Sequence, residues 1–192
     1  MYQTKKLNII DNSQLKASSQ EIDILIVIDT DYIRSHYTSP STDPNNPTGI
    51  DHNSQHMIAS NANALSGQGS ADLDFSARAG DVVSFRGTSI YQNSDDAVII
   101  YNIKYWSGEQ VFNNFVYNSV ERKEAVVPDV KSLNGLPATK ADITFASIDS
   151  KVRTTGKENF YVQFALYILD PKDSNKQILY GYFYWDPTIT VN

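Results

Sequence analysis

Residues 22–28 have the sequence Ile-Asp-Ile-Leu-Ile-Val-Ile, a short run in which almost every side chain is apolar. Isoleucine and valine are β-branched, and polar residues bound the run on both sides. These features favour a buried β-strand over a helix. The uninterrupted apolar part, Ile24–Ile28, is about a quarter of the length that a membrane-spanning helix needs. The stretch therefore predicts a strand in the core of a β-rich domain.

Similar strand patterns recur along the rest of the chain. In Ala71–Phe75, apolar and acidic residues alternate, as in a strand that buries one face. The other candidate strands are Val82–Arg86, Ala97–Trp106, Phe112–Val120, Ala141–Val152, Phe160–Leu169 and Ile178–Trp185. Short strands separated by polar turns, without a long amphipathic helix, are typical of a β-sandwich. We therefore predict a single all-β domain over residues 1–192, an antiparallel β-sandwich of jelly-roll or Greek-key type.

Three connections have recognisable turn chemistry. Thr154–Lys157 contains a glycine and is predicted to be a hairpin connection, and Asp170–Asn175 is expected to serve in the same way before the last strand. A brief helical turn is predicted for Asp129–Asn134, where Gly135 would end it.

The composition excludes several classes of function. The chain has 192 residues and no cysteine, so disulfides, thiolate nucleophiles, iron–sulfur clusters and cysteine-containing zinc sites are excluded. Its formal charge of −6, without a Lys/Arg-rich block, argues against a nucleic-acid or anionic-membrane surface. Met1–Asp11 is too short and too polar for the core of a signal peptide. We therefore expect a cytoplasmic protein.

One segment, Ser35–Gln55, differs from the rest because it is crowded with proline, asparagine and other polar residues. Three of its prolines fall within eight residues, which forbids both a helix and a central strand there. We predict one long Pro/Asn-rich loop, and long loops in compact domains are usually functional or disordered. All three histidines lie in or beside it: His36, His52 and His56.

Histidine is the commonest metal ligand, and the spacing of His52 and His56 would place two rings on one face of a helix. The Pro/Gly-rich surroundings make that helix improbable, and the glutamate of an H-E-x-x-H motif is absent. Asp51 and Asn53 suggest a calcium loop, but the EF-hand pattern fails at His56 and Ala62. We interpret the acidic and amide residues as turn formers and predict no metal and no cofactor.

The five residues His36, Asp51, His52, Asn53 and His56 remain the candidate ligand site of the loop. Elsewhere, Gly67–Ser70 lacks the lysine and the following helix of a phosphate-binding loop. A G-x-S-x-G nucleophile elbow is also absent from the sequence. We predict no catalytic residues and a protein that is not an enzyme.

The last candidate strand has two apolar faces. Tyr180, Tyr182 and Tyr184 alternate with Gly181, Phe183 and Trp185. One interpretation is a central strand whose tyrosines lie in the core or at its rim. The alternative is a tyrosine-rich face for a partner subunit or a stacking sugar, because tyrosine buries a large area at low entropic cost.

Three pieces of the sequence resemble the bacterial inclusion body protein family (the PixA/AidA-like group): the strand Ile22–Ile28 running into Asp29-Thr30, then Asn45–Ile50, and later Gly80–Arg86. With their spacing and the total length, the resemblance covers Ile22 to the C-terminus. It implies an intracellular bacterial β-sandwich protein without catalytic residues to transfer. Some members accumulate as crystalline inclusions, and others are controlled by quorum sensing and linked to host interaction. A known member is methionine-rich, whereas this chain has only Met1 and Met57, so the sequence does not favour methionine storage.

Our leading hypothesis is a non-enzymatic protein that self-associates, as a dimer or higher oligomer, or into ordered intracellular inclusions in stationary-phase or host-associated cells. The alternative is a binding module in which the loop Ser35–Gln55 and neighbouring aromatic residues recognise a carbohydrate or a host protein. A third hypothesis, a metal-dependent enzyme, would use the three histidines.

Overall fold

A computed structural model describes residues 19–192 of the chain. The prediction about a signal peptide concerns Met1–Asp11, which lies outside these residues. In order along the chain, the elements are β1 (Glu21–Ile28), α1 (Thr30–His36), β2 (Thr48–Gly49), β3 (Gln55–Ala59), β4 (Ala64–Ser66), β5 (Leu73–Phe75), β6 (Val82–Ser89), β7 (Ala97–Gly108), β8 (Val116–Asp129), β9 (Gly135–Lys151), β10 (Gly156–Asp170), β11 (Asp173–Trp185) and β12 (Thr188–Val191).

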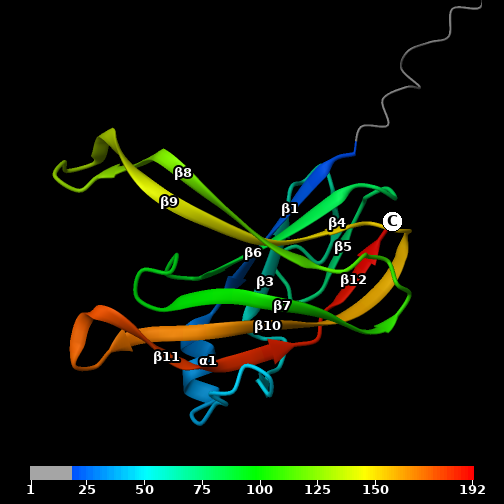
Figure 1. Ribbon diagram of the computed structural model, residues 1–192, viewed down its shortest axis with the longest axis horizontal. Helices are drawn as coiled ribbons and strands as arrows, with labels where there is room; N and C mark the ends of the chain where they lie inside the picture. The colour runs from blue at the N-terminus through cyan, green and yellow to red at the C-terminus, as the bar shows by residue number, and fades with distance from the viewer. Residues whose placement is uncertain (1–18) are drawn as a thin grey trace, which may run out of the picture.

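The strands form two sheets that pack face to face (Figure 1). The first sheet has the order β3-β1-β6-β9-β8, and the second has the order β2-β11-β10-β12-β5-β4, with β7 also paired to β10. The predicted β-sandwich is therefore confirmed.

The pairing within the sheets differs from the prediction of a purely antiparallel fold. β1 pairs with β6 in parallel, as do β11 with β2 and β12 with β5. Parallel neighbours need a long crossover instead of a tight turn. Here the crossover from β1 to β6 carries α1, the Pro/Asn-rich loop and four short strands, β2 to β5, of which β2 lies within the loop.

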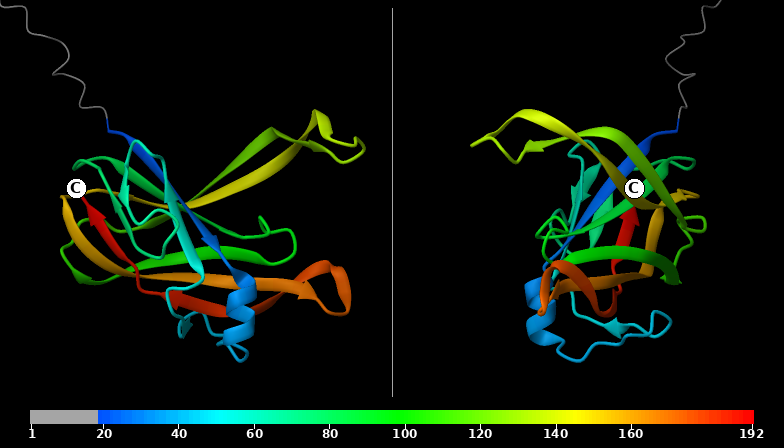
Figure 2. Two further views of the ribbon diagram at one scale, coloured as in Figure 1. Left: turned by 180° about the vertical axis from the view of Figure 1, so that it is seen from behind. Right: turned by 60° about the vertical axis from the view of Figure 1, so that its left-hand side comes forward.

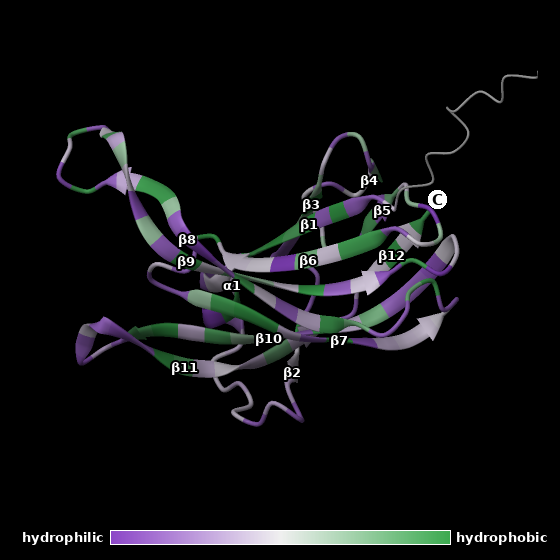
Figure 3. Ribbon diagram, turned by 45° about the horizontal axis from the view of Figure 1, so that its top comes forward, coloured by the Kyte–Doolittle hydropathy of each residue, from purple (hydrophilic) through white to green (hydrophobic). Residues whose placement is uncertain are grey.

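The core lies between the two sheets. Ile22, Ile24, Ile26 and Ile28 of β1 are buried, because alternate side chains of the strand point inward. From the opposite sheet, large aromatic residues meet them, including Phe164, Phe183 and Trp185. Phe164 and Phe183 stack with ring centroids 5.6 Å apart. Figure 3 shows the resulting alternation of hydrophobic and hydrophilic residues along the strands.

Two local predictions about turns are wrong. Asp129–Asn134 is the tip of the β8–β9 hairpin and contains no helical turn. Thr154–Lys157 joins β9 in one sheet to β10 in the other, so it is a crossover between sheets and no hairpin. The first segment is the turn between two strands that pair with each other, and the second connects strands whose partners lie elsewhere in the chain. Asp170–Asn175 does connect an antiparallel hairpin, β10–β11.

The helix α1 was not predicted from the sequence. The carboxylate of Asp29 accepts a hydrogen bond from the backbone N–H of Tyr32 at 3.1 Å, which caps the first turn. Arg34 forms an ion pair with Asp96 at 3.2 Å, and Ile33 is completely buried. Among residues 19–192, no helix is long and apolar enough to cross a membrane.

Candidate functional site

The most unusual feature of the molecule is a long β-hairpin, formed by β8 and β9, that projects from the sandwich (Figures 1 and 2). β9 pairs with β6 only from Ile148 to Lys151. Its remaining part, Gly135–Ser147, is hydrogen-bonded to β8 alone. We call this two-stranded part, residues 118–147, the arm. A two-stranded hairpin without further packing is only marginally stable in water.

The arm exposes apolar side chains at its end. Val130 and Leu133, in the turn, are exposed over at least 94% of their surface. Val126 and Leu136, on the two strands beside the turn, are also exposed. Because valine and leucine are normally buried in a monomer, this tip is an apolar patch without a partner in residues 19–192.

Five charged residues on the strands of the arm, in contrast, form ion pairs within the arm. Lys123 forms ion pairs with Glu121 at 2.6 Å and with Asp142 at 3.0 Å. Lys140 lies 3.0 Å from Glu124. These exposed pairs contribute little to stability, but they reduce the unpaired charge of the arm. The apolar tip is therefore the part of the arm best suited to a contact with another surface.

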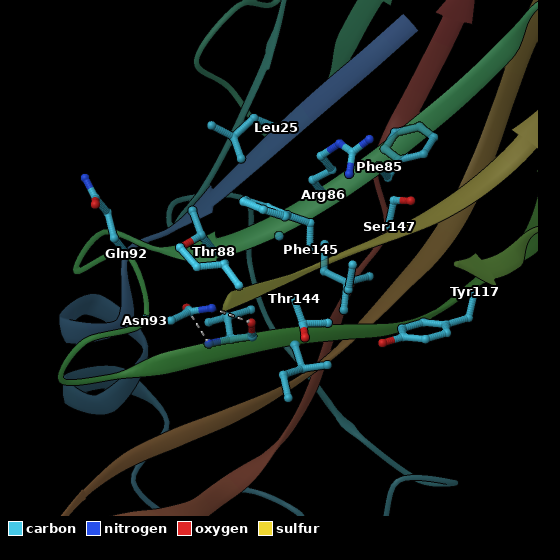
Figure 4. Close-up of a pocket in the computed structure, with 16 residues that line it drawn as sticks. Leu25, Phe85, Arg86, Thr88, Gln92, Asn93, Tyr117, Thr144, Phe145 and Ser147 are labelled. Carbon is cyan, nitrogen blue, oxygen red and sulfur yellow. Dashed lines mark hydrogen bonds between the residues drawn. The ribbon is translucent and has the colours of Figure 1, made fainter. Parts of the chain in front are cut away.

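An apolar groove of about 510 Å³ lies at the base of the arm, between the first sheet and β7 (Figure 4). Leu25 of β1, Phe145 of β9 and Ile99 of β7 line it and are exposed. At the floor, Gly87 permits close packing, because a Cβ there would lie 2.6 Å from Cγ1 of Ile100. Arg86 lines the same groove, but its guanidinium donates to Asp23 at 2.8 Å.

A second exposed surface lies on the outer face of the other sheet. Trp106 of β7 stacks on Tyr161 of β10 with centroids 5.4 Å apart, and Tyr161 meets Tyr184 of β11 edge-on at 5.0 Å. We call these three residues the aromatic row. Trp106 is exposed, while the two tyrosines are half-buried.

The three tyrosines suggested by the sequence do not share one face. β11 has one extra residue opposite Leu166 and Tyr167, which forms a β-bulge at Tyr180. Tyr180 therefore turns inward, where its ring stacks on Phe183 and its hydroxyl donates to the carbonyl of Tyr37 at 2.9 Å. Tyr182 and Tyr184 remain on the outer face of the sheet.

Tyr182 is covered by the Pro/Asn-rich loop. Its backbone N–H donates to the carbonyl of Ser41 at 2.8 Å, and its ring meets Tyr101 edge-on. The hydroxyl of Tyr101 in turn donates to the carbonyl of Pro44. Burial, followed by the neighbouring Tyr182 and Asp43, raises the pKa of Tyr101 to about 12. Of the predicted tyrosine face, only Tyr184 thus belongs to the aromatic row.

The three histidines lie apart from one another. His36 stacks on Tyr32 at 4.0 Å. His52 lies between two carboxylates, 3.2 Å from Asp186 and 3.6 Å from Asp72. One ring nitrogen of His56 is hydrogen-bonded to the carbonyl of Gly69 at 3.0 Å. Within residues 19–192, no group of three or more His, Asp or Glu side chains is arranged to hold a metal ion.

Two of the predicted loop residues, Asp51 and Asn53, meet around a tyrosine. The hydroxyl of Tyr32 donates to Asp51 at 2.7 Å and accepts from the side-chain amide of Asn53 at 3.1 Å. The backbone N–H of Asn53 also donates to Asp51 in an Asx-turn. Burial raises the pKa of Asp51, but the hydrogen bonds from Tyr32 and Asn53 outweigh it and hold the pKa below its usual value. This network fixes the end of the loop to α1.

Comparison with known proteins identifies the family. The sequence model of the inclusion body protein family PixA matches residues 20–191. The chain belongs to the PixA inclusion body protein family. A crystal structure of a PixA inclusion body protein from Burkholderia cenocepacia J2315 is similar, with 31% sequence identity and a TM-score of 0.74. The match covers 93% of this chain and 99% of the other. No match was found among curated proteins.

Membership of the PixA family confirms the resemblance seen in the sequence, and the chain is thus a member of a family of inclusion body proteins. The arm, however, was missed from the sequence. The sequence pattern predicts strands at Phe112–Val120 and Ala141–Val152 and a helical turn at the tip, whereas β8 runs to Asp129 and β9 begins at Gly135. A signal was available, because Val126 and Val127 on one side of the tip and Asn134-Gly135 on the other are typical of a hairpin.

Proposed function

We propose that this PixA-family protein self-associates through the arm into oligomers or ordered intracellular inclusions. The single observation that supports this function is the two-stranded arm with its exposed apolar tip. Each of Val130 and Leu133 would gain roughly 1.5–3 kcal/mol from complete burial. A second copy of the chain can provide that burial and can add packing to an otherwise two-stranded hairpin.

The groove at the base of the arm is the partner surface that we propose for the tip. It is apolar, lies outside the sandwich core, and exposes Leu25, Ile99 and Phe145. Tip and groove are different surfaces of one chain. If the contact is reciprocal about a two-fold axis, it closes a dimer. A heterologous contact forms a closed ring when the rotation between copies closes, and continues from copy to copy when it does not. The continuing arrangement would build an ordered inclusion.

The proposal is tested with the double variant Val130→Ser/Leu133→Ser. Both side chains are almost completely exposed in one copy, so the free energy of unfolding should change by less than about 0.5 kcal/mol. In sedimentation velocity over a concentration series, we expect the wild type to form discrete oligomers. The variant should dissociate at least about tenfold more readily, which corresponds to about 1.4 kcal/mol.

The matched control is Leu65→Ser, which removes an exposed leucine from β4, far from the arm in the chain. It should associate like the wild type and form the same inclusions in overexpressing, stationary-phase cells. A wild-type protein that stays monomeric at high concentration, or a double variant that associates unchanged, would contradict the proposal.

The aromatic row supports a second candidate function, the binding of a carbohydrate or a host protein. Stacked aromatic rings on an outer sheet face offer a large area with polar tips, as binding surfaces often do. If the row binds sugars, Trp106→Ala should lose at least about 90% of the binding seen on a glycan array, whereas the exposed Tyr117→Ala on β8 should keep it. An array without any wild-type binding would remove the carbohydrate function.

A further inference from the structure

A second hollow, of about 910 Å³, is lined by other residues than the groove. It lies between the second half of β7, the β7–β8 loop and the start of β10. Unlike the groove, it contains a buried acid, Glu158, together with an exposed basic side chain, Arg153. Neither the arm nor the aromatic row uses these groups.

The acid is Glu158, which is only 2% exposed. Its Oε2 accepts hydrogen bonds from the backbone N–H groups of Val111, at 2.5 Å, and Phe112, at 3.0 Å. These bonds hold the β7–β8 loop against β10. Its other oxygen, Oε1, accepts no hydrogen bond from any residue between 19 and 192, although Glu158 lines the hollow. One oxygen therefore has a structural role, and the other is left for a group that enters the hollow.

The charge of Glu158 is incompletely compensated. Burial raises the pKa of its carboxyl group, and the two backbone hydrogen bonds and the positive charge of Arg153 lower it only in part. The guanidinium of Arg153 donates to Gln110 at 3.1 Å and forms no ion pair with Glu158 in the described chain. A buried carboxylate without a close cation is costly, and a cationic donor at Oε1 would remove much of that cost.

The rim of the hollow has the opposite charge. Arg153, which follows β9, is exposed there. Phe112 and Phe115 supply an apolar wall, and their ring centroids lie 5.6 Å apart. The hollow thus has a negative floor, a positive rim and an aromatic side.

We propose that this hollow binds a small zwitterion of the α-amino-acid class. The ligand's ammonium group binds Oε1 of Glu158, its carboxylate binds Arg153, and its side chain packs on Phe115. A neutral sugar could donate a hydrogen bond to Oε1 of Glu158. It would not compensate the negative charge of Glu158 or the positive charge of Arg153, so it fits the site less well. This site is independent of self-association through the arm.

Calorimetric titration of the full chain with L-leucine and L-phenylalanine tests the proposal, with glucose as the neutral probe. We expect dissociation constants below about 1 mM for the amino acids. Isoamylamine, which lacks the carboxylate of leucine, and isocaproate, which lacks the ammonium group, should each bind at least about tenfold more weakly.

Glu158→Gln separates the ligand site from the role of Glu158 in holding the loop. Glutamine keeps a carbonyl oxygen that can accept from Val111 and Phe112, so the variant should fold, which thermal unfolding checks. It should bind leucine at least about tenfold more weakly than the wild type. Arg153→Gln should weaken leucine binding but leave isoamylamine binding unchanged.

The control variant is Glu109→Gln, which changes an exposed carboxylate in the same loop and should bind leucine like the wild type. Three results would each overturn the proposal: no amino-acid binding by the wild type at about 10 mM, equal binding by folded Glu158→Gln, or tighter binding of glucose than of leucine.

Discussion

Glu158 shows how a single buried residue links the fold to the solution pH. Its pKa is raised above the ordinary value of 4.5, mainly by burial. The unfolded chain therefore releases this proton at a lower pH than the folded chain does. Between the two pKa values the folded state binds more protons, so this residue's contribution to stability falls as the pH rises.

We predict that Glu158→Gln removes this pH dependence. From about pH 4 to about pH 8, the stability of the wild type should fall relative to the variant, by about 1.4 kcal/mol for each unit by which the pKa is raised. The loss of stability should begin near the pKa of Glu158 in the unfolded chain. It should be complete above the raised pKa of Glu158 in the folded chain. Urea unfolding of both proteins across this range measures the difference. If the wild type instead becomes more stable relative to the variant as the pH rises, the pKa of Glu158 is lowered in the folded state and the prediction is wrong.

Several residue-level properties could be predicted from the sequence, and others could not. The alternation along Ile178–Trp185 predicts a strand with two apolar faces, and the structure buries the side that carries Gly181, Phe183 and Trp185. The position of Tyr180 depends on a bulge that appears only when β10 is paired with β11. The approach of Asp72 and Asp186 to His52 likewise depends on the packing of distant segments.

At the scale of single elements, the edges of the two sheets differ in how they are protected. The Pro/Asn-rich loop pairs with β11 through β2 and through Ser41, so it covers that edge. The long loop predicted from the sequence is thus a cover for a strand. β8, at the edge of the other sheet, carries a register shift between Arg122 and Ala125 as well as Pro128. The register shift and the proline both make it harder for the free edge of β8 to pair with a strand of another molecule.

The helix α1 is the element whose stability is easiest to test. Asp29→Ala removes the side-chain acceptor for the N–H of Tyr32, and we expect it to cost about 0.5–2 kcal/mol of unfolding free energy. Asp29→Asn retains a capping oxygen and should cost only a small part of that. Denaturant unfolding of the two variants measures both values. Equal destabilisation by alanine and asparagine would show that the charge, and not the cap, is important.

Strand existence was predictable because it depends on local alternation, as in β1 and β11. The partners of a strand were less predictable. Thr154–Lys157 has the chemistry of a turn, but the choice between a hairpin and a crossover depends on which sheet receives β10. The arm could not be predicted for the same reason. Its existence depends on β8 and β9 continuing past the last residues of β9 that pair with β6.

At the scale of the whole molecule, the sandwich and the arm have different physical requirements. The sandwich encloses one hydrophobic cluster to which both sheets contribute. The arm projects away from that cluster (Figure 1), and the apolar side chains at its tip are exposed. Among residues 19–192 the arm has no packing partner, which is why we propose a second copy of the chain as that partner. This agrees with its membership of a family of inclusion body proteins.

The most direct test of this account is hydrogen exchange of the arm amides in the full chain at several protein concentrations. Self-association through the arm predicts that amides of β8 and β9 in residues 118–147 exchange quickly in dilute solution and become protected as concentration rises. The core amides of β1 and β10 should be protected at every concentration. Arm amides that exchange at one rate throughout, while another surface becomes protected, would contradict the account.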